Sequence, residues 1–218
     1  MSITMISATP SPYARINRIA MLEKGIPFTL QTEIPWHSDT ATPKHNPLEK
    51  LPVLVFSDGR EPIYDSSHIQ RWIVAKYATQ GPRLITGDID TDLKLEQVQV
   101  LSQGVMDAIV LAFFEKARES KSEAWEARQT RKVRGGFKAF EELAKGKAKD
   151  EDYLFANRLT IADIAVVCAV GFADFNGFDR EWKEKYPALA AYWKKLDERG
   201  SFASTRPQMF DIETDKVI

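Results

Sequence analysis

The sequence has very little cysteine: Cys168 is the one cysteine among 218 residues. A lone cysteine cannot form an internal disulfide, which is typical of proteins from a reducing compartment such as the cytoplasm. The three histidines, His37, His45 and His68, are scattered and form no zinc-binding spacing with it. No glycine-rich phosphate loop is present either. We therefore expect a cytoplasmic protein without a metal site.

The chain also lacks an excess of charge of either sign, since 30 basic and 31 acidic residues leave a net charge of -1. This balance excludes the basic face that nucleic acids or anionic lipids require. The most apolar stretch, residues 161–175, is interrupted by Asp163 and Asp174 and is shorter than the ~20 residues of a membrane span. Residues 1–8 lack the basic lead and the length of a signal peptide. We expect no membrane, no nucleic acid and a small-molecule ligand.

Strand and helix patterns alternate in the first third of the chain. We expect, in order, a strand at 3–7, a helix at 13–24, a strand at 27–33, a hairpin of strands at 52–56 and 61–64, and a helix at 66–79. Beyond a linker at 80–92 rich in Gly, Pro and Asp, strand patterns disappear. The expected helices there are at 93–120, 123–147, 160–177 and 187–199. The sequence predicts a mixed α/β domain at 1–82 and an all-α domain at 90–218.

Ser11 and Pro12 stand between the first strand and the first helix. Proline suits the first helical position, so Ser11 is the expected N-cap. Capping alone would account for this serine. Its place at the carboxyl end of a strand in a βαβ unit, however, favours a ligand site at the positive start of the helix.

Two further segments can likewise be interpreted either as purely structural or as part of a ligand site. Leu51 precedes Pro52 at the start of an apolar strand, and if their peptide bond is cis, the main chain of Leu51 could face a ligand. Asp65 and Ser66 precede the helix at 66–79 and suit capping. They also suit a zwitterion, with the carboxylate bound by Ser66 and the ammonium by Asp65.

Thr160 and Asp163 fit a capping box ahead of an apolar helix, with Asp in place of the usual Glu. We interpret this pair as structural, because each side chain satisfies main-chain donors at the helix start.

In this order, Ser11-Pro12-Tyr13-Ala14-Arg15, Asn46 to Leu54, Asp65-Ser66 and Leu159 to Asp163 resemble the glutathione transferase family. The resemblance covers nearly the whole chain and is to serine-type cytosolic members, similar to the tau, phi and omega classes. It implies a thioredoxin-like N-terminal domain with the order βαβ-α-ββα and a mixed four-stranded sheet, followed by an all-helical domain. It also implies glutathione as co-substrate, a small electrophile and a homodimer.

The resemblance also implies roles for individual residues. Ser11 is similar to the serine that hydrogen-bonds the glutathione sulfur, and Leu51, before Pro52, to the residue whose main chain pairs with the cysteinyl unit. Asp65 and Ser66 are similar to the acid–serine pair that holds the γ-glutamyl end. The family usually has Glu before this serine, so Asp65 is a shorter variant. The glycyl carboxylate would meet Lys50, which is similar to the basic residue that approaches it in some classes, and His37 or Lys44 could share that role.

The electrophile would contact apolar side chains, for which we expect Tyr13, Met106, Ile109, Val110 and Phe113. Arg15 lies one turn after Ser11 and could add positive potential or be a plain surface arginine. Two alternatives to a transferase remain open: a glutathione-binding module with a regulatory role and little turnover, and a carrier of large apolar ligands.

Overall fold

A computed structural model describes residues 2–147 and 151–210. The chain divides into two compact units, Met1–Arg83 together with Ala203–Ile218, and Leu84–Phe202. The division after Arg83 falls within the linker expected at 80–92. Residues 203–210 group with the first unit. There Thr205 contacts Arg15, and the ring of Phe210 contacts the ring of Trp36.

The sheet of the first unit has three strands in the order β2-β1-β3. Strand β1 (Ile3–Ser7) pairs parallel with β2 (Thr29–Thr32) and antiparallel with β3 (Val53–Phe56). Ser7 lies opposite Thr32, and Ile6 lies opposite Val53. The carboxyl ends of β1 and β2 therefore meet the amino end of β3 at one edge of the sheet.

The expected fourth strand, at 61–64, is reduced to a single bridge between Leu54 and Ile63. Two main-chain hydrogen bonds of 2.9 and 3.0 Å join these residues. Pro62 has no N–H to extend the ladder, and Asp65 already caps the next helix, so no room is left for a longer strand. The expected short helix between the two halves of the sheet is one 3-10 turn, η1 (Thr42–Lys44).

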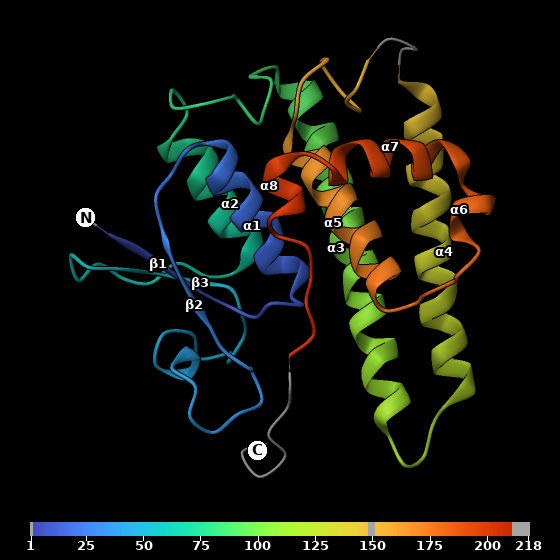
Figure 1. The fold of residues 1–218 in the computed structure, drawn as a ribbon, viewed down its shortest axis with the longest axis horizontal. Helices are drawn as coiled ribbons and strands as arrows, with labels where there is room; N and C mark the ends of the chain where they lie inside the picture. The colour runs from blue at the N-terminus through green and yellow to red at the C-terminus, as the bar shows by residue number, and fades with distance from the viewer. Residues whose placement is uncertain (1, 148–150, 211–218) are drawn as a thin grey trace. The chain divides into compact units, whose positions relative to one another are not determined.

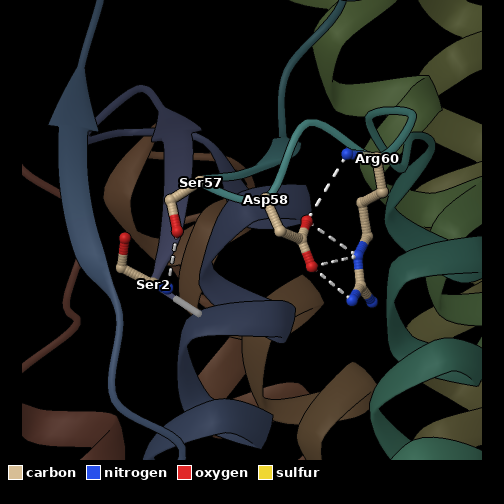
Figure 2. Close-up of polar contacts among 4 residues, drawn as sticks. All are labelled: Ser2, Ser57, Asp58 and Arg60. Atoms are coloured by element: carbon tan, nitrogen blue, oxygen red, sulfur yellow. Dashed lines mark hydrogen bonds and ion pairs between the residues drawn. The ribbon is translucent and has the colours of Figure 1, made fainter.

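The turn after β3 lies at the opposite edge of the sheet (Figure 2). Gly59 adopts φ 78°, a conformation that favours glycine. The Arg60 guanidinium binds the Asp58 carboxylate with contacts of 2.6 to 3.1 Å, which lowers the pKa of that carboxyl. Ser57 and Ser2 exchange hydrogen bonds of 2.9 and 3.1 Å. At this end of the unit, the polar groups of Ser2, Ser57, Asp58 and Arg60 bind one another.

Helices α1 (Pro12–Glu23) and α2 (Ser66–Lys76) pack side by side in the first unit (Figure 1). Lys24, next to the end of α1, is almost fully buried, and its ammonium donates to the carbonyls of Tyr77 and Gln80 at 2.8 and 3.0 Å. Burial, and secondarily Arg83, lowers the pKa of Lys24. These bonds fix the chain that follows α2 against the end of α1. The core side chains with no exposed surface include Met5, Ile19, Met21, Val53, Leu54, Ile69 and Ile73.

The second unit is helical. Its helices are α3 (Ile89–Ala117), α4 (Glu123–Gly146), α5 (Ile161–Phe175), α6 (Trp182–Lys185) and α7 (Pro187–Asp197), and α8 (Gly200–Ala203) follows them. Helix α3 packs against both α4 and α5. A Cβ at Gly136 of α4 would collide with the side chain of Val105, so glycine permits the close approach of α3 and α4.

The capping box at the start of α5 is confirmed. The Asp163 carboxylate is fully buried and accepts from the N–H groups of Leu154 and Thr160 at 2.8 Å, from the Thr160 hydroxyl at 2.6 Å and from the Tyr192 hydroxyl at 2.7 Å. Burial raises the pKa of Asp163 despite these four donors. Burial, and then the neighbouring Asp163, raises the pKa of Tyr192 well above its usual value. This cluster joins the segment before α5 to α7.

Helix α3 is long and apolar enough to cross a membrane by length and composition, a test that core helices of soluble proteins also pass. In the described part of the chain it is the one such helix. The buried side chains of α3, among them Leu95, Val98, Val105 and Met106, belong to the core. We interpret α3 as a core helix of the second unit.

Candidate functional site

The fold brings three of the predicted site segments to one edge of the sheet. Ser11 follows the carboxyl end of β1, while Leu51 and Pro52 precede the amino end of β3, where Val53 lies opposite Ile6. The bridge between Leu54 and Ile63 turns the chain back, so that Asp65 and Ser66 arrive beside the same edge. Segments 11, 51–52 and 65–66 therefore converge, although they are far apart in sequence.

Ser11 is the N-cap of α1, with Pro12 at the first helical position, as expected. Its Oγ accepts a hydrogen bond from the N–H of Ala14 at 3.2 Å. This bond uses a lone pair, so the hydroxyl hydrogen can still be donated to a ligand. Ser11 is half-buried, and the start of a 12-residue helix adds partial positive charge at this point. The local geometry suits an anion that accepts a hydrogen bond.

The peptide bond between Leu51 and Pro52 is cis. Pro52 is buried, whereas Leu51 is half-buried. Within residues 2–147 and 151–210, the main-chain N–H and C=O of Leu51 make no hydrogen bond. An extended peptide could use both groups, as a neighbouring strand would.

Asp65 and Ser66 share the start of α2, but in different roles. The Asp65 carboxylate is the N-cap and accepts from the N–H groups of Ser67 and His68 at 2.9 and 3.3 Å, both through the same oxygen. Its other oxygen could still accept from an ammonium. Ser66 is the first helical residue and is nearly buried. In the part of the chain that the structure describes, its N–H and hydroxyl have no partner, which suits a carboxylate.

Two residues whose role the sequence did not reveal hold the loop between β2 and β3. Glu33 accepts from the N–H groups of Ala41 and Thr42 and from the Thr42 hydroxyl at 2.6 to 3.1 Å. Partial burial alone would raise the pKa of Glu33, but the hydrogen bonds, of which that from the Thr42 hydroxyl is the strongest, lower it overall. Asn46 donates to the carbonyl of Lys50 at 2.8 Å. No spacing rule signals these contacts, because each joins residues within an irregular loop.

The three basic candidates for the glycyl carboxylate differ in exposure. Lys44 and Lys50 are exposed, so each can reach a bound anion. His37 is buried, with 5% of its surface exposed, and its main chain forms hydrogen bonds with Ile34 and Thr40. Of these three basic side chains, Lys44 and Lys50 are thus the exposed ones.

Tyr13 is half-buried in the first turn of α1, close in sequence to Ser11. Arg15, one turn on, is not a surface residue, because only 3% of its surface is exposed. Its Nε lies 3.5 Å from the Thr205 hydroxyl, to which it donates. Arg15 therefore anchors the C-terminal segment to α1, and this contact involves no ligand.

The apolar residues predicted for the electrophile lie on α3 in the second unit. Met106 and Ile109 expose 1% and 2% of their surface, so they are core side chains and cannot contact a ligand without rearrangement. Val110 is half-buried and Phe113 is 44% exposed. The apolar prediction on α3 therefore narrows to these two. Cys168 is fully buried in α5.

Comparisons with known proteins identify the family of the chain. The family model for the glutathione S-transferase N-terminal domain matches residues 10–76, and that for the C-terminal domain matches residues 123–194. The "Uncharacterized GST-like protein YibF" of Escherichia coli K12 is 32% identical over 206 residues, which cover 93% of this chain and 98% of YibF.

Two solved structures are similar over nearly the whole chain. A glutathione S-transferase from Methylobacterium radiotolerans in complex with glutathione sulfonate is 42% identical, covers 100% of both chains and has a TM-score of 0.90. One from Methylobacillus flagellatus with bound glutathione is 29% identical, covers 95% of this chain and 100% of its own, and has a TM-score of 0.86. The chain described here belongs to the glutathione S-transferase family.

Proposed function

We propose that this protein is a glutathione transferase in which Ser11 stabilises the glutathione thiolate for attack on small, mostly apolar electrophiles. One observation carries the proposal: at one end of the sheet lie a helix cap that can donate a hydrogen bond and the main chain of Leu51, which has no hydrogen-bond partner among the described residues. The solved relatives that bind glutathione or its sulfonate support the choice of ligand.

Each part of glutathione has a partner of matching chemistry in this proposal. The cysteinyl unit pairs with the N–H and C=O of Leu51. The γ-glutamyl carboxylate accepts from Ser66 at the start of α2, and its ammonium lies against Asp65. Lys50 or Lys44 attracts the glycyl carboxylate. A peptide held at both ends places its sulfur at the start of α1.

The reaction needs the thiolate, because the thiol is a weak nucleophile. A free thiol has a pKa of about 8.5, and each unit by which the site lowers it requires about 1.36 kcal/mol of preference for the anion. The Ser11 hydroxyl donates to the sulfur, and the helix start adds positive potential. The sulfur loses its proton to solvent, and its electron pair then forms a bond to the electrophilic carbon. The leaving group departs with the electrons of the broken bond.

The direct test is titration of the wild-type protein with glutathione, followed by turnover of a chloronitrobenzene and a panel of other electrophiles. We expect glutathione binding and release of chloride from the chloronitrobenzene. Binding without turnover on the whole panel would instead favour a regulatory glutathione-binding module. Binding of large apolar dyes without glutathione affinity would favour a carrier.

The assembly and location of the protein form a separate part of the proposal. Helix α3 exposes Leu93, Val100 and Leu111 at spacings that place them on one face. We propose that a second copy of the chain covers this face in a cytoplasmic homodimer. Light scattering should then give twice the mass of the chain, and a monomer at micromolar concentration would contradict this part alone.

A further inference from the structure

A cavity of about 400 Å³ lies in the second unit, where α3 ends and α4 begins. The two helices pack against each other and are joined by residues 118–122 (Figure 1). The cavity is lined by side chains of both helices and of the segment that joins them: Leu111, Phe114, Glu115, Arg118, Ser122 and Trp125. It shares no residue with the segments 11, 51–52 and 65–66 that we assign to glutathione. The cavity is therefore separate from the site described above.

The buried charge in this cavity is negative. Only 4% of the surface of Glu115 is exposed, and its carboxylate accepts from the N–H of Ser122 at 2.6 Å. Arg118 pairs with it at 3.7 Å, but the Arg118 side chain is 69% exposed. Such an exposed arginine stabilises an ion pair little and turns to solvent at small cost, whereas a buried carboxylate requires a partner. The carboxylate is thus fixed in place, and the guanidinium can be exchanged for another cation.

Aromatic rings form the walls beside this carboxylate. Phe114 and Trp125 line the cavity and are 43% and 40% exposed, so ring surface is open to a ligand. The neighbouring Phe113 meets Phe114 edge-on, with ring centroids 5.5 Å apart. The faces of aromatic rings attract cations, and tryptophan attracts them most strongly. The walls therefore favour the same sign of charge as the buried carboxylate.

The helix ends at the cavity do not oppose a cation. Helix α3 ends at Ala117, and its last carbonyls carry partial negative charge. The start of α4 is positive, but Glu123 and Glu126 lie in its first turn and offset that charge. The remaining charges of residues 116–121, two lysines and Glu119, are exposed and screened by water and salt. Glu115 is the charge that a ligand in the cavity meets without this screening.

We propose that this cavity binds a small organic cation, namely a quaternary ammonium ion or a protonated amine with apolar substituents. The charged nitrogen lies against the carboxylate of Glu115 in place of the Arg118 guanidinium, and the apolar groups around it lie against Phe114 and Trp125. A cavity of about 400 Å³ is within the usual size of small-molecule sites. The site is independent of the proposed transferase function.

The test compares choline with 3,3-dimethylbutan-1-ol, which has the same shape but carbon in place of the charged nitrogen, by titration calorimetry at low salt. The wild type should bind choline at least about tenfold more tightly than the alcohol. Glu115→Gln keeps an acceptor for the N–H of Ser122 but removes the charge, so it should abolish this preference. Trp125→Leu should weaken choline binding about fivefold. Equal affinity of the wild type for both compounds, or no binding of choline, would overturn the inference.

Arg118→Ala gives the sharpest result, because removal of a competing cation should strengthen choline binding at least about threefold. The matched control is Arg128→Ala, an exposed arginine of α4 outside the cavity, which should leave the affinity near that of the wild type. Unchanged or weaker choline binding in Arg118→Ala would contradict the inference. Thermal unfolding near the wild-type temperature shows that a variant is folded. Because Leu111 also lies on the face that we assign to a second copy, light scattering on the same samples identifies the assembly that binds.

Discussion

The helices α1 and α5 begin in the same way, each with a hydroxyl residue as N-cap, but the two starts differ in what remains unsatisfied. At α5, Thr160 is fully buried and Asp163 accepts four hydrogen bonds. At α1, Ser11 is half-buried, and its Oγ accepts one hydrogen bond within residues 2–147 and 151–210, from the N–H of Ala14. A hydroxyl residue at the N-cap is thus structural where other protein groups satisfy all its hydrogen bonds. Where they do not, the same cap suits a ligand.

The largest effect on stability should come from a substitution of Asp163, which satisfies the buried hydrogen-bond donors at the start of α5. Asp163→Ala leaves the N–H groups of Leu154 and Thr160 and the hydroxyl of Tyr192 buried without their acceptor, at a cost of about 1–3 kcal/mol for each unsatisfied group. We expect a loss of at least about 3 kcal/mol in the free energy of unfolding, measured by urea denaturation. Asp88→Ala, at the exposed cap of α3, is the control and should cost much less. Equal losses would show that saturation of the cap does not matter.

A smaller effect, on glutathione affinity, is expected from a substitution at the start of α2. Ser66→Ala removes a hydroxyl that we assign to the γ-glutamyl carboxylate, a charge-assisted bond worth about 1.5 kcal/mol. Glutathione affinity measured by calorimetry should fall about tenfold, with little change in thermal stability. Ser67→Ala, one residue on, should leave the affinity near that of the wild type. An unchanged affinity in Ser66→Ala would remove this residue from the site.

The smallest effect is expected from a substitution of Glu33, which holds the loop between β2 and β3. The pKa of Glu33 is lowered in the fold, so its contribution to stability is present above its unfolded pKa and is lost as the pH falls through its folded pKa. Glu33→Gln should therefore flatten the dependence of the urea midpoint on pH below about pH 4.5, with the exposed Glu61→Gln as control. Identical pH profiles for wild type and Glu33→Gln would contradict this assignment.

Local signals in the sequence predicted those features of the two helix starts that depend on neighbouring residues. Ser11 before Pro12, and Thr160 with Asp163, identify both caps because the bonds form within one turn. Proline breaks and apolar periodicity likewise predicted the main helices and the division near residue 83. Family resemblance, rather than spacing, supplied the role of Leu51.

Contacts between distant residues could not be predicted. The contact of the segment after α8 with α1 depends on Arg15 and Thr205, which are 190 residues apart. The sequence likewise did not reveal that the strand expected at 61–64 would shrink to one bridge, because that depends on Pro62 and on how much chain α2 requires. The burial of Met106 and Ile109 follows from which face of α3 meets the core, and an apolar stripe alone does not distinguish core from pocket.

The central claim is that Ser11 holds the glutathione sulfur as a thiolate, and the ultraviolet absorbance of the bound thiolate measures this directly. A pH titration of the wild-type complex should give an apparent pKa at least one unit below the ~8.5 of a free thiol. Ser122→Ala, which removes the equivalent cap bond at α4, should titrate like the wild type. Ser11→Ala should return the pKa towards the free value and lower turnover at least about tenfold, while glutathione affinity stays within a few fold. If Ser11→Ala titrates like the wild type, the account is wrong.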